Sequence, residues 1–125
     1  MDKIKYLGGA ALAYVGDAVL ELFIREKLIG SGETDTGKLS TVAQKLVCAE
    51  KQSALAEKLI PLLDENEQDV YRLGRNYKPS SKPRHALAVE YHRASGFEAV
   101  FGYLHLCGKD DRARELFAAV YEEEI

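Results

Sequence analysis

Two acidic residues stand inside strongly apolar stretches of the sequence, far apart along the chain. Asp17 lies in LAYVGDAVLEL, residues 12–22, and Glu98 lies in SGFEAVFGYLHL, residues 95–106. A carboxylate that is buried without a partner destabilises a fold, so each of these acids needs a ligand, a partner or access to solvent. One or two carboxylates, together with waters and substrate phosphates, are a normal site for Mg²⁺. The two stretches therefore predict a divalent-cation site if they meet in the fold.

Each acid also has an ordinary structural explanation, and the residues alone leave both open. Gly16 can break the first apolar run into two short helices, with Asp17 as the N-cap of the second. If the helix is instead continuous, Asp17 and Glu21 share one face. Glu98 can be a solvated helical glutamate. Alternatively, Gly96 and Gly102 beside it indicate that another helix, of which the one containing Asp17 is the natural candidate, packs closely there.

Basic residues are concentrated in one segment of an otherwise acidic chain. The net charge of the chain is −3. The segment from Arg72 to Arg93 holds six basic residues and one acid, Glu90, so its net charge is +5 and that of the remaining residues is −8. This asymmetry favours a local anion-binding surface, although a solvated basic loop gives the same pattern. Within it, NYKPSSKPR contains two of the three prolines and is predicted to be an exposed loop.

Apolar residues recur at helical spacing through most of the chain, and no stretch alternates convincingly as a strand does. The pattern predicts an all-α domain of about six helices. The expected helices are 7–28, a helix capped by Asp35 or Thr36 with apolar residues from Leu39 to Val47, 50–59, the stretch 63–76, 86–106 and 111–122. Gly108 is expected to end the fifth helix.

Composition places the chain among soluble globular proteins. Its 125 residues, 46% hydrophobic and 30% charged, fit one domain over 1–125. MDKIKYLGG precedes no long apolar segment, so neither a secretory signal nor a membrane span is expected. Cys48 and Cys107 lack metal-ligand spacing and are expected to be reduced core thiols of a cytoplasmic protein. The histidines likewise lack a ligand pattern.

The two acidic stretches resemble a known family. LAYVGDAVLEL is similar to the signature helix of ribonuclease III domains, and GFEAVFGYL resembles the second acidic helix of that family. LGRNYK and the short chain are closest to the Mini-ribonuclease III branch, which has a catalytic domain and no double-stranded-RNA-binding domain. Asp17 and Glu98 match the family's acidic positions. The chain departs at Ala13 and Ser95, where many family members have further acids.

The resemblance implies a homodimeric ribonuclease III-type endonuclease fold that hydrolyses double-stranded RNA to 5′-phosphate products. It implies Mg²⁺ as cofactor, with Mn²⁺ as a substitute, and Asp17 and Glu98 as catalytic and metal-binding residues. Expected RNA-binding residues are Arg75, Asn76, Lys78, Lys82, Arg84 and His85. Expected partners are precursors of 23S ribosomal RNA, a second copy of the chain and a large-subunit ribosomal protein. The alternatives are a non-catalytic ribonuclease III-like module that binds RNA or ribosomes and, more distantly, a metal-dependent phosphohydrolase of small nucleotides.

Overall fold

The computed structural model describes residues 7–78 and 88–125. Within these ranges the chain forms six α-helices, one short 3-10 helix and no strand, which confirms the all-α prediction. The elements are α1 (Gly9–Gly30), α2 (Thr36–Val47), α3 (Ala49–Leu59), η2 (Ile60–Leu62), α4 (Glu65–Asn76), α5 (Ala88–Leu106) and α6 (Asp110–Tyr121). Their bounds lie within one or two residues of those expected, and the expected start of the fifth helix lies outside the described residues.

Local signals in the sequence set several of these helix ends. The Asp35 side chain accepts hydrogen bonds from the backbone N–H groups of Gly37, at 2.9 Å, and Lys38, at 3.2 Å, and so caps α2. Asp64 caps α4 in the same way and forms a reciprocal capping box with Glu67. Gly108, with φ of +73°, lies just beyond α5 in the left-handed region that glycine adopts readily, as expected for a helix terminator.

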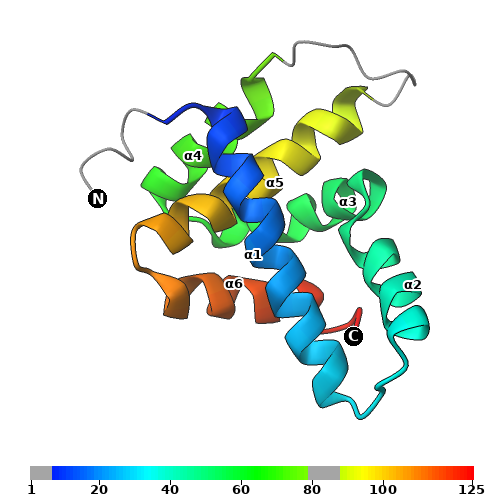
Figure 1. The fold of residues 1–125 in the computed structure, drawn as a ribbon. Helices are drawn as coiled ribbons and strands as arrows, with labels where there is room; N and C mark the ends of the chain where they lie inside the picture. The colour runs from blue at the N-terminus through cyan, green and yellow to red at the C-terminus, as the bar shows by residue number, and fades with distance from the viewer. Residues whose placement is uncertain (1–6, 79–87) are drawn as a thin grey trace.

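α1 is one continuous helix, so a break at Gly16 and Asp17 is the wrong alternative. The reason is a close crossing with α5. A Cβ on Gly16 would lie 1.7 Å from the backbone oxygen of Glu98, and a Cβ on Gly102 would lie 2.0 Å from the backbone oxygen of Leu12. Each glycine therefore lets the other helix approach, as Figure 1 shows where α1 passes over α5.

Gly96, the other glycine of α5, has a different neighbour from the one expected. A Cβ on Gly96 would lie 2.7 Å from the Tyr71 ring, so this glycine faces α4 rather than α1. Six residues of α-helix rotate the side-chain direction by about 600°, so Gly96 and Gly102 lie on different sides of α5. As a result, α5 is held between α1 and α4, and α3 packs against it as well.

The core draws side chains from all six described α-helices, and Phe97, Phe101 and Tyr121 are among the largest that are fully buried. A buried ion pair joins α4 to α6, because Arg112 donates to both oxygens of Glu67 at 2.9 and 3.0 Å. Both described cysteines are free thiols, but Cys48 is exposed, so the expectation that it lies in the core is wrong. In the described ranges, no helix combines the length and the apolar character needed to cross a bilayer.

Candidate active site

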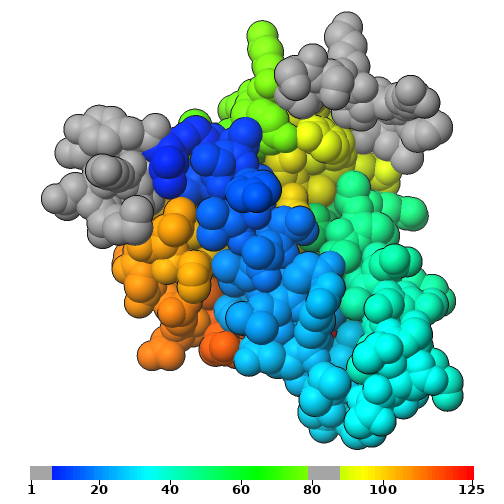
Figure 2. All heavy atoms as spheres, viewed as in Figure 1, coloured from blue at the N-terminus to red at the C-terminus, as the bar shows by residue number. Residues whose placement is uncertain are grey.

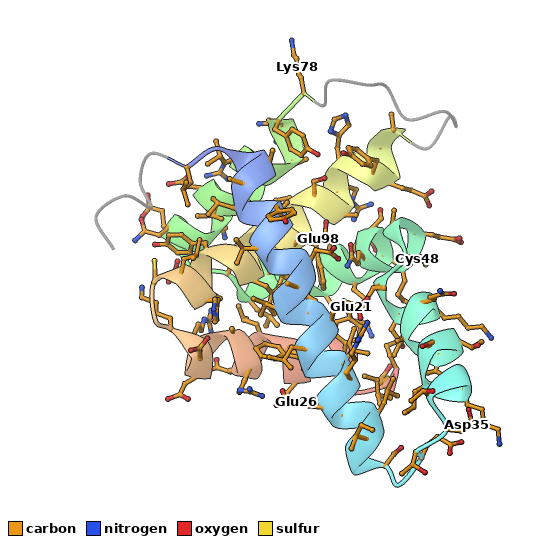
Figure 3. All side chains as sticks on the ribbon, viewed as in Figure 1. Glu21, Glu26, Asp35, Cys48, Lys78 and Glu98 are labelled. Atoms are coloured by element: carbon orange, nitrogen blue, oxygen red, sulfur yellow. The ribbon has the colours of Figure 1, made fainter. Side chains whose placement is uncertain are left out.

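The crossing of α1 and α5 brings the two acidic side chains together. Gly16 sits against the backbone of Glu98, and Asp17 is the next residue along α1, on its exposed face. The Asp17 carboxyl group lies close enough to Glu98 to raise the pKa of that side chain. Figure 3 shows Glu98 beside α1. The convergence expected from the sequence is therefore present, across 81 positions of the chain.

The pair is electrostatically unusual. Burial raises the pKa of Glu98 to about 8, and a hydrogen bond and charge repulsion from Asp17 act in the same direction, while the nearby Gln52 amide lowers it. Two carboxylates this close cannot both be ionised at low cost unless a proton or a cation lies between them. The pair is therefore chemically suited to share a proton or to bind a cation.

Glu21, one turn beyond Asp17, has a partner of its own, since it accepts a hydrogen bond from Arg25 at 3.0 Å. Across residues 7–78 and 88–125 no cluster of three or more His, Cys, Asp or Glu side chains could hold a metal ion. Ala13 and Ser95, where the family pattern allows acids, are both buried and add no carboxylate. The site thus offers two carboxylates, of which that of Asp17 is exposed to solvent.

Gln52 on α3 is a residue of this site that the sequence did not single out. It is 2% exposed, and its amide lies beside the Glu98 carboxylate. A signal was present, because Leu55, Ala56 and Leu59 form the buried face of α3 and position 52 falls on that face at helical spacing. A polar residue at a position where the helical spacing predicts a buried apolar one is a signal of a functional residue.

A basic depression lies at the end of α4, next to the start of the described part of α5. Its volume is about 380 Å³, and the residues that line it are Arg75, Asn76, Lys78, Val89, His92 and Arg93. Three of the expected RNA-binding residues, Arg75, Asn76 and Lys78, are thus brought together and are exposed. Figure 3 shows Lys78 projecting outward there.

The other three expected RNA-binding residues, Lys82, Arg84 and His85, lie outside the described residues. Arg93 belongs to the basic segment of the sequence but, like His92, was not among the expected RNA-binding residues. Both line the basic depression because they stand on α5 opposite the end of α4. Arg93 also forms an ion pair with Glu57 of α3, at 3.4 Å. Along α5, Glu98 is five residues beyond Arg93, which is about 7.5 Å of helical rise. Five residues also rotate the side-chain direction by about 500°, so the basic depression and the acidic pair share α5 but leave it in different directions.

Comparison with known proteins places the chain in a family. The model of the ribonuclease III domain matches residues 10–109. A Mini-ribonuclease 3 of Symbiobacterium thermophilum is 44% identical over 108 residues, covering 86% of this chain and 83% of the relative. The Mini-ribonuclease 3 of Enterococcus faecalis is 39% identical over 118 residues, covering 93% and 89%. A crystal structure of a Fusobacterium nucleatum protein superposes with a TM-score of 0.86 at 28% identity, covering 98% of this chain and 94% of that one. The chain belongs to the ribonuclease III family and groups within it with the Mini-ribonuclease 3 proteins.

Proposed function

We propose that this chain is a Mg²⁺-dependent endoribonuclease that cleaves double-stranded RNA and matures the ends of 23S ribosomal RNA precursors in the cytoplasm. Its family makes it a ribonuclease III-type endoribonuclease of double-stranded RNA. The observation that carries the proposed metal dependence is the meeting of Asp17 and Glu98 at the crossing of α1 and α5.

The two carboxylates fit a hard divalent cation. Mg²⁺ prefers oxygen ligands and usually takes one or two carboxylates while keeping several waters and substrate phosphates. Mn²⁺ accepts the same oxygen donors and is the expected substitute. When bound, Mg²⁺ lowers the pKa of a coordinated water and neutralises charge that develops on the phosphodiester during hydrolysis. Asp17, on the exposed face, is open to solvent and substrate, while Glu98 is the more enclosed of the two ligands.

The basic depression supports the choice of a polyanionic substrate. Arg75 and Lys78 supply positive charge, and Asn76 supplies a neutral donor for phosphate or ribose oxygens. Double-stranded RNA is read mostly through its shape, its phosphates and its 2′-hydroxyls. In this proposal Lys82, Arg84 and His85 extend the same phosphate contacts.

A second copy of the chain is the proposed partner of the outer face of α1. Tyr14, Leu22 and Ile29 are 83%, 55% and 54% exposed, and their spacing of eight and seven residues places them along one side of the helix. In Figure 2 the surface of α1 is open along most of its length. A twofold homodimer through this stripe covers apolar surface and presents two acidic pairs to one duplex. A large-subunit ribosomal protein as a further partner remains a proposal from the family resemblance.

A cleavage assay with matched variants tests the proposed function. Wild-type protein with Mg²⁺ is expected to cut a structured duplex RNA into products with 5′-phosphates, whereas Asp17→Asn and Glu98→Gln are expected to bind the duplex without cutting it. Glu26→Gln is the control, since it removes an exposed acid of α1 that pairs with Arg114 at 3.4 Å, away from the site. If the wild type binds the duplex but leaves it intact, a non-catalytic RNA-binding module is the better assignment.

A further inference from the structure

Gln52 occupies a position where an apolar side chain would be expected. It lies on the inward face of α3 with Leu55, Ala56 and Leu59, and only 2% of it is exposed. α3 packs against α5, the helix that carries Glu98. An apolar residue of similar size would fill the same space without burying an amide. Packing alone therefore does not account for glutamine at this position.

The amide nitrogen of Gln52 is also unpaired. Nε2 is fully buried and has no hydrogen-bond partner among the residues that the structure describes. An NH₂ group has two hydrogens to donate, and buried donors in native proteins are normally bonded. The carboxyl group beside this amide is that of Glu98. The unused donor therefore lies next to one of the two acids of the site.

We propose that Gln52 is a positioning residue: its Nε2 amide donates a hydrogen bond to one oxygen of the Glu98 carboxylate when the site holds a divalent ion, leaving the other oxygen for the ion it shares with Asp17. This inference rests on the proposed function, because it assumes that the two acids bind a cation.

A neutral amide suits this role. A lysine or arginine at the same place would neutralise Glu98 and compete with the cation, whereas an amide orients the carboxylate and leaves its charge available. Partners that hydrogen-bond to a metal ligand orient it, and their loss typically weakens metal affinity or activity about 10- to 100-fold.

The test compares metal binding with folding in single variants. Gln52→Met keeps an unbranched side chain of similar length but has no donor, and Gln52→Leu is a second apolar replacement should the first fold poorly. Ser53→Ala is the matched control, because Ser53 is the next residue of α3 and is 4% exposed. Mn²⁺ affinity is measured without RNA, by electron paramagnetic resonance of the free ion. Thermal unfolding is measured in chelator.

A positioning role predicts that Gln52→Met unfolds at the wild-type temperature or higher in chelator, since it removes an unpaired buried amide. It also predicts that this variant binds Mn²⁺ about 10- to 100-fold more weakly, with Ser53→Ala unchanged. Wild-type Mn²⁺ affinity in both Gln52 variants would overturn the inference, as would a loss of stability with metal affinity preserved. If the wild type and Asp17→Asn bind Mn²⁺ equally weakly, the proposed metal site itself fails.

Discussion

Replacing Gly16 with alanine tests whether the α1–α5 crossing positions the two acids. The added Cβ would lie 1.7 Å from the backbone oxygen of Glu98 and 2.5 Å from its carbonyl carbon. Ordinary non-bonded contact at these atoms needs roughly 3.5 Å. Because both obstructing atoms belong to the backbone, no rotamer change can relieve the clash, and α1 must move away from α5.

Two opposing effects set the magnitude. Overpacking typically costs about 1–3 kcal/mol, and a clash with backbone belongs at the upper end of that range. Alanine is favoured over glycine in a helix by roughly 1 kcal/mol. The expected net loss is therefore about 2 kcal/mol, which a domain with a stability of ~5–15 kcal/mol tolerates. The fold is retained, but the main chain of Glu98 shifts relative to Asp17. A displacement of about 1 Å at a reacting centre can lower the rate on the order of 100-fold.

The assay is urea unfolding together with cleavage of duplex RNA under saturating Mg²⁺. Gly30→Ala is the matched control, since Gly30 ends the same helix and an added Cβ there meets nothing within 4 Å. This control is expected to be as stable as the wild type or slightly more so, and fully active. A Gly16→Ala protein with wild-type stability and wild-type cleavage would refute the idea that close backbone approach at this crossing builds the site.

Four further predictions concern charge and assembly. Glu67→Gln is expected to cost about 3 kcal/mol in urea unfolding at pH 7, because it leaves Arg112 without its buried partner. The hydrogen bond from Arg112 lowers the pKa of Glu67, so the stabilisation by this ion pair is fully present above pH 4.5 and is lost as the pH falls through the folded-state pKa of Glu67. The Glu67→Gln variant should lose no stability from this source in acid. Glu98 has its pKa raised from 4.5 to about 8, so stability in chelator should fall as the pH rises across that interval, whereas Glu98→Gln should show a flatter profile. Arg75→Ala is expected to weaken duplex binding uniformly and to reduce the salt dependence of binding by about one ion, read from titrations at several salt concentrations. Tyr14→Glu should convert a dimer to a monomer in light scattering, and a monomeric wild type would contradict the proposed interface.

The sequence predicted the helices well because their ends are encoded locally. The carboxylate of Asp35 and the left-handed Gly108 act within a few residues, so a pattern in the chain reveals them. The close approach of α1 to α5 was also foreseeable, since Gly102 interrupts an otherwise apolar helix. The mutual approach of Asp17 and Glu98 follows from that crossing.

What the sequence did not reveal depends on how separate helices are oriented. Gln52 reaches Glu98 only because α3 packs against α5 with that face inward, which no local pattern determines. His92 joins the basic depression because the start of α5 lies against the end of α4. Gly96 was assigned to the wrong neighbour because glycine spacing indicates a close contact without identifying the helix that makes it.

The central claim is that Asp17 and Glu98 jointly bind one divalent ion. A crystal structure of the protein soaked in Mn²⁺, with anomalous scattering used to locate the ion, tests it most directly. We expect one anomalous peak between α1 and α5, within coordination distance of carboxylate oxygens from both residues. An ion bound elsewhere, or no peak at this crossing at a saturating Mn²⁺ concentration, would contradict the account.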